Sequence, residues 1–254
     1  MDIVLIGSGN TATVLGRRLV AGGHQILQVF SPQQQHAERL ALRLKTSPIS
    51  SKDFINKKAE GIIISLRDEA LADFVHNLSF PDSLVMHTAG ALSIGEIRNL
   101  STSYGVLYPL QSLRKEIETI PPLNLLVDGN NDDTLQRIKN LALTISENVI
   151  VAHDDVRLKY HLAATLVNNF TNHLFVLTES FCEKENISFV VLQPLLEETV
   201  MRLKNISPFI AQTGPAMRRD QQTLEKHRLI LNQYPDLARV YELFTEEIQK
   251  FYST

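Results

Sequence analysis

A glycine-rich turn near the amino terminus has the residue types and spacing of a loop that binds phosphate groups. It follows the apolar run Ile3–Ile6, opens a stretch of helical spacing and reads Gly7, Ser8, Gly9, Asn10, Thr11, Ala12. In this pattern the first glycine allows a tight turn, the second lets backbone approach a pyrophosphate, and a small third residue allows close packing. The N–H groups at the helix start attract phosphate. The loop predicts a dinucleotide site, with an ordinary strand-to-helix turn as the alternative.

The residues after the second expected strand, Gln25–Phe30, bear on which dinucleotide binds. An acidic residue at this point binds the ribose 2′-hydroxyl of NAD, but the chain has Ser31 there. His36 and Arg39 lie on the following helix, where they could meet a 2′-phosphate. The alternative is that both are solvated helix residues. The pattern favours NADP over NAD.

Three later loops follow expected strands, and ligands bind beyond the carboxyl ends of strands in doubly wound sheets. Ser65 and Leu66 follow the third strand and Thr88 follows the fourth, so we expect these residues to contact the cofactor. Nearby Asp68 is better explained as a residue at a helix N-terminus, where the helix dipole stabilises a carboxylate.

The same loops offer polar side chains to a substrate. His87, in the sequence His87-Thr88-Ala89-Gly90, places an imidazole where nicotinamide and substrate would meet, although a loop histidine can also cap a turn. Tyr108 and Gln111 follow the next short strand and are able to orient a substrate, with a proline-fixed turn as the alternative.

A polar stripe follows one side of the expected helix over residues 154–184. His161, Thr165, Asn168 and Asn172 are separated by four, three and four residues, and His173 lies beside them. Apolar residues occupy the other sides, so we expect this helix to be buried nearly all round. A row of buried polar groups indicates a polar helix–helix interface or a wet cleft, and we favour the cleft.

A fourth group of residues lies near the carboxyl end, in the sequence Thr213-Gly214-Pro215-Ala216-Met217-Arg218-Arg219-Asp220. The Arg218 guanidinium could bind a substrate carboxylate or phosphate. Pro215 suits a first helical turn, so capping and a surface salt bridge explain the motif equally well.

The elements needed to position these residues follow from hydrophobic periodicity. Residues 1–151 alternate short β-branched runs with amphipathic stretches, as βαβ units do. Strands are expected at Ile3–Ile6, Gln25–Phe30, Gly61–Ser65, Leu84–His87, Val106–Leu107 and Leu123–Val127. Helices are expected at residues 11–22, 34–44, 67–77, 93–100 and 132–146. Runs such as Ile62–Ile64 do not alternate with polar residues, which indicates strands covered on both faces.

The hydrophobic pattern changes from strand-like to helical after the β-branched run Val149–Val151. Residues 152–254 contain long helical patterns at 154–184, 188–204, 215–232 and 235–252, and Pro194 predicts a kink or a later start in the second of these. We therefore expect an α/β doubly wound, mainly parallel Rossmann sheet in residues 1–151 and an all-α domain for substrate and dimer contacts in residues 152–254.

Composition excludes several classes of function. The chain has 254 residues, 44% of them hydrophobic, which is enough for a sizeable core. A formal charge of -3 gives no general attraction for nucleic acid or anionic membrane. The single cysteine, Cys182, has no partner for an internal disulfide and no metal-ligand spacing. With no targeting segment at its amino terminus, the protein is expected in the cytoplasm.

Taken together, these motifs resemble a family of Rossmann-like NADP oxidoreductases whose helical second half is a domain of unknown function. The resemblance covers nearly the whole chain and rests on the phosphate loop, His87–Gly90, Tyr108–Gln111, Asn168–His173 and Thr213–Asp220. The first domain is similar to those of pyrroline-5-carboxylate reductase and the deazaflavin-dependent NADP reductases. The resemblance implies a reductase architecture and a homodimer formed through the helical domain.

The chain departs from related dehydrogenases at the position of their proton donor. In the related β-hydroxyacid dehydrogenases and ketopantoate reductases, a lysine on the first long helix of the second domain donates a proton, with an asparagine one turn later. The similar positions here are Asn168 and Asn172, and Lys159 lies upstream of them. Protonation would then come from His87, Tyr108, His161 or His173. We expect an NADP-dependent oxidoreductase acting on a small carbonyl or imine between the two domains; the alternative is a non-catalytic NADP sensor.

Overall fold

The structure is a computed structural model that describes residues 1–119 and 122–252. The chain forms two compact units, residues 1–168 and 169–254, called here the sheet unit and the helical unit. The domain boundary expected after residue 151 coincides with the end of the last strand, and the sheet unit runs on through helix α5 (Asp154–Ala164) to Asn168.

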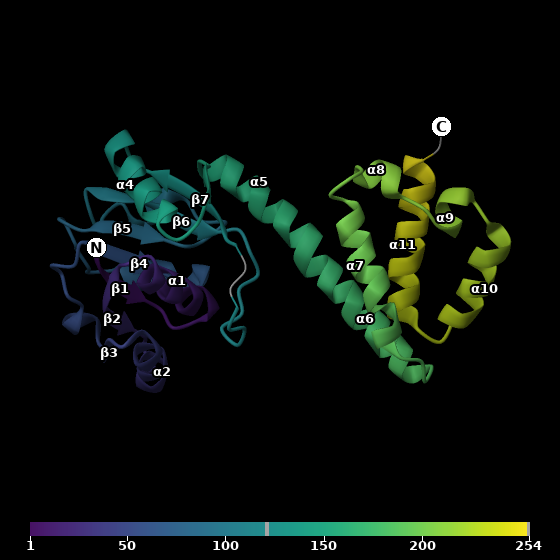
Figure 1. Ribbon diagram of the computed structural model, residues 1–254, viewed down its shortest axis with the longest axis horizontal. Helices are drawn as coiled ribbons and strands as arrows, with labels where there is room; N and C mark the ends of the chain where they lie inside the picture. The colour runs from purple at the N-terminus through teal and green to yellow at the C-terminus, as the bar shows by residue number, and fades with distance from the viewer. Residues whose placement is uncertain (120–121, 253–254) are drawn as a thin grey trace. The chain divides into compact units, whose positions relative to one another are not determined.

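An eight-stranded sheet in the order β3-β2-β1-β4-β5-β6-β7-β8 forms the centre of the sheet unit (Figure 1). The strands are β1 (Asp2–Ile6), β2 (Gln25–Phe30), β3 (Ser47–Ile49), β4 (Gly61–Ile64), β5 (Leu84–His87), β6 (Ser103–Pro109), β7 (Asn124–Gly129) and β8 (Asn148–Val151). Every neighbouring pair is parallel except β6 and β7. This confirms the predicted mainly parallel Rossmann sheet.

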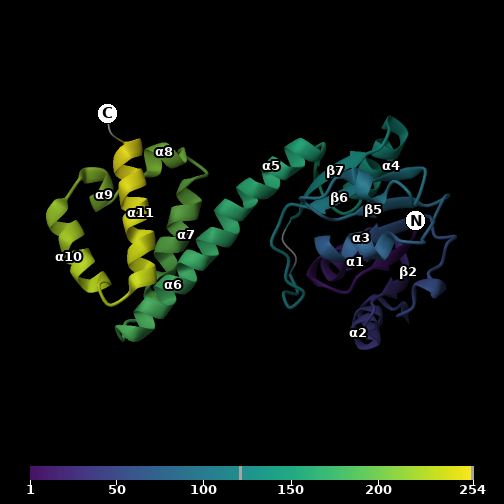
Figure 2. The same ribbon diagram turned by 180° about the vertical axis from the view of Figure 1, so that it is seen from behind.

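Both faces of the sheet are covered, as the continuous apolar runs predicted. Ile3 and Leu5 of β1 pack into one apolar cluster with helices α1 (Asn10–Ala21), α2 (Gln34–Leu44) and α4 (Asp132–Leu143). Val4 and Ile6 pack into a second cluster with α3 (Asp68–Val75). Figure 1 shows α1 on the viewer's side of the sheet, and Figure 2 shows α3 on the opposite side. Alternate residues of one strand therefore enter opposite cores.

Four of the five helices expected before residue 151 are present as α-helices. The helices of the sheet unit are α1 (Asn10–Ala21), α2 (Gln34–Leu44), α3 (Asp68–Val75), α4 (Asp132–Leu143), α5, and two short 3-10 helices, η1 (Lys52–Phe54) and η2 (Ile94–Ile97). The helix expected over residues 93–100 is only the single 3-10 turn η2. Strand β3, which contains Pro48, was not predicted; as an edge strand it needs only one hydrogen-bonded side.

The predicted helix over residues 154–184 is continuous but changes its winding. It consists of α5, a π-helix η3 (Thr165–Phe170) and α6 (Thr171–Lys184). A π-helix adds a residue to each turn, so the spacing that placed His161, Thr165, Asn168 and Asn172 on one stripe is interrupted. The Thr165 hydroxyl donates to the His161 carbonyl at 3.0 Å within this region.

Our expectation that this helix is buried nearly all round is wrong for the described chain. Leu162, Val167 and Phe170 are 60%, 74% and 61% exposed. Its apolar residues lie on several sides, and one chain does not provide enough neighbouring surface to cover them all.

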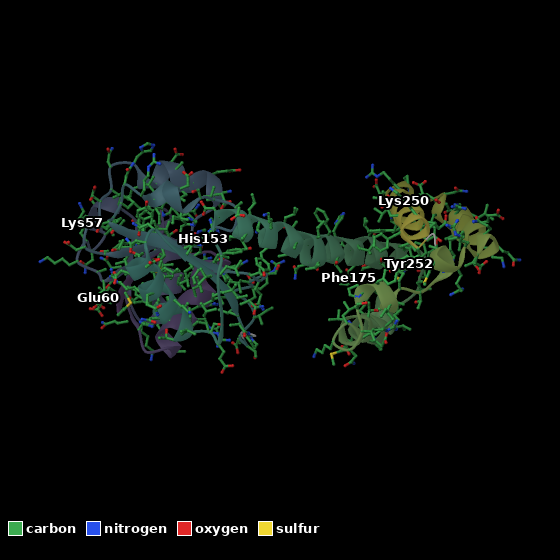
Figure 3. All side chains as sticks on the ribbon, turned by 90° about the horizontal axis from the view of Figure 1, so that it is seen from above. Lys57, Glu60, His153, Phe175, Lys250 and Tyr252 are labelled. Atoms are coloured by element: carbon green, nitrogen blue, oxygen red, sulfur yellow. The ribbon has the colours of Figure 1, made fainter. Side chains whose placement is uncertain are left out.

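The helical unit contains η4 (Phe189–Leu192), α7 (Gln193–Arg202), α8 (Pro208–Ala211), α9 (Pro215–Arg218), α10 (Gln221–Leu231) and α11 (Pro235–Phe251). The α-helix of the second predicted segment starts late, at Gln193, with Pro194 in its first turn. Tyr252, which follows α11 and is labelled in Figure 3, donates to the Phe209 carbonyl at 3.0 Å and stacks on the Phe209 ring. In the described residues no helix is long and apolar enough to cross a membrane.

Candidate active site

The first turn of the phosphate loop requires glycine. Gly7 has φ +117°, and a Cβ built on it would lie 2.3 Å from the Ser65 carbonyl oxygen. Its N–H donates to the Phe30 carbonyl at 2.8 Å, which joins the loop to the end of β2. Gly7 therefore lets the chain turn tightly between the ends of β1, β2 and β4.

The second glycine leaves the start of α1 open to a ligand. A Cβ on Gly9 would meet no atom within 4 Å, and no side chain caps the N-terminus of α1. The early N–H groups of α1 are therefore available to an anion. Ala12 is fully buried at the third small position of the motif. These residues fit the pyrophosphate of a dinucleotide.

Hydroxyl groups line the strand ends next to this loop. Ser8 donates to Ser31 at 3.1 Å, and Thr88 donates to Ser65 at 3.3 Å. Ser31 and Thr88 are buried. The structure thus brings together four residues that we predicted to contact the cofactor, at the carboxyl ends of β1, β2, β4 and β5.

Tyr108 and His161 form a hydrogen-bonded pair at the same edge of the sheet. The Tyr108 hydroxyl lies 2.9 Å from His161 Nδ1, and the rings meet edge to face. Burial raises the pKa of the Tyr108 phenol, and the Asp68 carboxylate acts in the same direction. Tyr108 comes from β6 and His161 from α5, so the pair joins the sheet to the helix that follows its last strand.

Gly90 makes room for this pair. A Cβ at Gly90 would lie 2.7 Å from His161 Nδ1 and 2.8 Å from Tyr108 Cζ. The loop after β5 thus touches both rings through a residue without a side chain.

His87 is enclosed beneath this loop. Its side chain is buried, its Nε2 contacts the Ser93 carbonyl at 3.2 Å, and its Nδ1 accepts from the Ala89 N–H at 3.2 Å. Burial lowers the pKa of the imidazole to about 4, and the nearby Arg157 charge contributes. A neutral imidazole with both nitrogens bonded to backbone fixes the loop, and this geometry favours a positioning role over the proton-donor role we assigned from the sequence.

Arg157 and Asp154, in the first two turns of α5, hold the same loop from the other side. The buried Arg157 guanidinium donates to the Leu92 carbonyl and, at 2.7 Å, to Asp154. Asp154 also accepts from the Ile94 N–H at 3.1 Å. Burial opposes ionisation of Asp154, but hydrogen bonds from Ser93, Arg157 and Ile94 lower its pKa. Asp154 and Arg157 were not predicted from the sequence. The available signal was an acidic and a basic residue three positions apart at the start of an apolar helix.

The remaining predicted substrate residues lie in different places. Asn168 accepts from the Ser112 hydroxyl at 2.7 Å, within the sheet unit. Gln111 Oε1 is buried and has no hydrogen-bond partner among the residues that the structure describes. Asn172, His173 and Arg218 are exposed residues of the helical unit. Their assigned roles stay predictions.

The motif around Arg218 performs the capping that we considered from its sequence. Gly214 has φ +107°, Pro215 starts α9, and Asp220 accepts from the Thr223 N–H at 3.1 Å to cap α10. The Asp220 carboxylate also accepts from the Thr223 hydroxyl, and these bonds lower its pKa.

A pocket of about 560 Å³ lies beside the phosphate loop. It is lined by Ser8, Gly9, Thr13, His36, Arg39, Leu40, Leu42, Arg43 and Lys115. Both α2 residues that we proposed to meet a 2′-phosphate, His36 and Arg39, therefore face the same space as the phosphate loop. Within the described ranges, no group of three or more His, Cys, Asp or Glu residues could hold a metal ion.

The sheet, the open helix start and the hydroxyls at the strand ends define a Rossmann-fold protein that binds a nicotinamide-type dinucleotide. Residues 2–89 match the family model described as NADP oxidoreductase, coenzyme F420-dependent, and residues 123–248 match a domain of unknown function, DUF2520. Among proteins with curated descriptions, none matches this chain.

Solved structures support the same class. A Bacteroides fragilis protein, whose name provisionally assigns it as an NADP oxidoreductase, is 32% identical over 98% of both chains, with a TM-score of 0.92. The chain belongs to this family of NADP oxidoreductases with a DUF2520 domain.

More distant structures share the fold alone. The 1-pyrroline-5-carboxylate reductase of Streptococcus pyogenes is 14% identical over 98% of both chains, with a TM-score of 0.64. An imine reductase of Myxococcus stipitatus in complex with NADP⁺ is 13% identical over 98% of this chain and 94% of its own, with a TM-score of 0.68.

Proposed function

We propose that this protein reduces a small carbonyl or imine with NADPH and that the Tyr108–His161 pair supplies the proton. The observation that carries the proposal is the 2.9 Å contact between the two side chains at the edge of the sheet that holds the phosphate loop. β1, β4, β5 and β6 are neighbours. Tyr108 is thus three strands, about 14 Å, from that loop, a span suited to the nicotinamide end of a dinucleotide.

The protein's own residues have three tasks in this proposal. The α1 N–H groups and Gly9 bind the pyrophosphate, while Ser65 and Thr88 line the path from it toward β6. When bound, NADPH supplies a hydride to the substrate carbon. Tyr108 donates its proton to the carbonyl oxygen or imine nitrogen. The phenolate is then reprotonated through His161, whose Nδ1 gives up a proton while its Nε2 takes one from water. A phenol with its ordinary pKa is protonated at neutral pH, and the raised pKa of Tyr108 acts in the same direction.

The test is reduction of a panel of small carbonyl and imine acids, followed by the absorbance of NADPH. Tyr108→Phe is expected to slow hydride transfer about 100-fold while leaving NADPH affinity unchanged. Tyr104→Phe, on the same strand, is the matched control and is expected to keep wild-type turnover. Equal rates in the wild type and Tyr108→Phe would exclude Tyr108 as the proton donor.

A specific observation favours a second candidate, a non-catalytic NADP sensor. Lys159, the lysine upstream of Asn168, is 77% exposed and pairs with Asp155 at 3.4 Å. It therefore offers no replacement for the lysine proton donor of the related dehydrogenases. NADPH binding without oxidation by any substrate in the panel, together with cofactor-dependent binding of a partner protein, would favour the sensor.

We also propose that a second copy of this chain covers the helical unit. Val190 and Val191 of η4 are 63% and 76% exposed, and Phe251 at the end of α11 is 70% exposed. Exposed apolar side chains of this size on several helices favour association through the hydrophobic effect. The family resemblance indicates a homodimer through this domain. The expectations of a substrate between the two domains and of a cytoplasmic protein stay predictions.

Sedimentation equilibrium tests this assembly. The wild type is expected to have twice the mass of the chain, and replacing both Val190 and Val191 by Ser is expected to weaken the dimer. Leu42→Ser is the control, because Leu42 is 82% exposed on α2 of the sheet unit. A wild-type monomer at all concentrations would exclude the proposal.

A further inference from the structure

The segment that follows β6, residues 110–119, is fastened to the helices beside the phosphate loop; we call it the strap. The Arg17 guanidinium of α1 donates to the Ile117 carbonyl at 3.2 Å and to the Glu118 carbonyl at 2.6 Å. Leu113 packs against the apolar cluster beneath α1 and α2. One side chain of α1 and one apolar contact thus hold a segment about 100 residues away in the chain.

Lys115 is the strap residue whose backbone is held most closely. Its N–H donates to Asn10 Oδ1 of the phosphate loop at 3.3 Å. Its carbonyl accepts from the Arg43 guanidinium of α2 at 3.3 Å. These two bonds fix the backbone of Lys115 between the phosphate loop and α2. They use only its backbone atoms, and Lys115 also lines the pocket beside the loop.

The side chains around Lys115 favour an anion. Lys115 lines the pocket of about 560 Å³ together with His36, Arg39 and Arg43, and among the described residues no acidic side chain lines it. The pocket also reaches Ser8 and Gly9 of the phosphate loop. In a Rossmann domain the adenosine ribose lies beyond the second strand, next to the phosphate loop. The cations therefore surround the place where a 2′-phosphate would extend.

We propose that Lys115 determines cofactor specificity by binding the 2′-phosphate of NADP from the strap, opposite the cations of α2. This inference rests on the proposed NADP dependence and deepens it. A phosphate dianion gains charge-assisted hydrogen bonds from an ammonium group, whereas the 2′-hydroxyl of NAD gains little. The second strand lacks an acidic residue that would favour NAD, and the strap supplies a positive counterpart from the other side.

The experiment measures binding rather than activity. Adenosine 2′,5′-bisphosphate and adenosine 5′-monophosphate are titrated into the full chain in a calorimeter, since they differ only in the 2′-phosphate. Lys115→Met is expected to weaken the bisphosphate about tenfold and to leave the monophosphate unchanged. Arg114→Met is the matched control, because Arg114 precedes Lys115 on the strap and does not line the pocket.

A second variant tests the strap itself. Arg17→Met removes the bonds to Ile117 and Glu118 without removing a cation of the pocket, and it is expected to weaken the bisphosphate by a smaller factor than Lys115→Met. The weakening by Lys115→Met is expected to shrink at high salt because the pocket is open to solvent.

Three results would overturn the inference. Lys115→Met and Arg114→Met could bind the bisphosphate equally well, or Lys115→Met could weaken both nucleotides by the same factor. In either case nucleotide binding by the phosphate loop still stands, and only the role of Lys115 fails. A wild type that binds neither nucleotide would instead contradict the proposed function and this inference with it.

Discussion

The two units of this protein bury their apolar residues to very different extents. In the sheet unit, every residue of β4 and β5 is buried, and two apolar clusters fill both sides of the sheet. In the described part of the helical unit, the only buried apolar residues are Cys182, Ala216, Leu224 and Leu231. The sheet unit therefore has a complete core within one chain, whereas the helical unit does not.

This difference shows how the two units are stabilised. A central parallel sheet with helices on both faces leaves little apolar area uncovered. Helices that are apolar on more than one side need additional surface, from neighbouring helices or from another chain. Polar contacts join α10 and α11 in the helical unit, such as the two bonds from Arg228 to Glu242 at 2.8 and 3.0 Å. Such exposed pairs add little stability.

The largest expected effect is on the core of the sheet unit. Ile63 of β4 is fully buried, so Ile63→Ala is expected to lower the free energy of unfolding by about 2 to 5 kcal/mol. The matched change in the helical unit is Leu229→Ala; Leu229 is 71% exposed, and a cost within about 0.5 kcal/mol is expected. Denaturant unfolding at low protein concentration measures both. Equal costs would show that Leu229 is covered in solution and that the two units do not differ in burial at these positions.

The second effect is a pH dependence that arises from a buried histidine of the sheet unit. The pKa of His87 is lowered to about 4, from an ordinary value of 6.5. Below pH 6.5 His87 binds a proton in the unfolded chain but stays neutral in the folded chain. The free energy of unfolding therefore falls as the pH drops from 6.5 to 4 and then levels off. The loss by pH 4 is about 3 kcal/mol.

His87→Gln is expected to remove this part of the pH dependence, although it also changes the bonds to Ser93 and Ala89. Stability curves of both proteins at several pH values, with hydrogen exchange to follow the loop after β5, measure the effect. Parallel curves for the variant and the wild type would contradict a neutral buried His87.

The smallest effect concerns helix capping, a local interaction that both units share. Asn131 caps α4 of the sheet unit by accepting from the Thr134 N–H at 2.9 Å, as Asp220 caps α10 of the helical unit. Asn131→Ala is expected to cost about 1 kcal/mol, and Asn131→Asp, which keeps an acceptor, much less. Thermal unfolding checks the order of the three proteins. A wild-type stability in Asn131→Ala would show that capping contributes nothing here.

Much of the fold could be predicted because the governing signals are local. The bounds of β2, β5 and α2 agree with the prediction residue for residue, since each is a clear apolar pattern between turn residues. Strand β3 could not be found in this way, because three residues with a central proline carry no pattern. The π-helix η3 also escaped, since its sequence is compatible with ordinary α-helical winding.

The candidate site likewise has parts that local sequence predicts and parts that depend on long-range contacts. The phosphate loop was predictable because its function is encoded in consecutive residues. Tyr108 was found because it follows the apolar pair Val106–Leu107, although the structure places it inside the longer strand β6. The contact of Tyr108 with His161 spans 53 positions, and that of Lys115 with Asn10 spans 105. Neither contact can be predicted from the spacing of nearby residues in the sequence. Burial of the long helix was predicted wrongly for a related reason, since a hydrophobic pattern shows that a side chain needs cover but not which chain provides it.

Gly90 has a consequence for reading other sequences of this kind. Since any side chain at that position would strike both Tyr108 and His161, the three positions cannot vary independently. We expect sequences that keep tyrosine and histidine at positions 108 and 161 to keep glycine at 90. Where a larger residue stands at 90, a smaller or absent ring is expected at one of the other two. An alignment can therefore divide the family into members that retain the tyrosine–histidine pair and members that lack it.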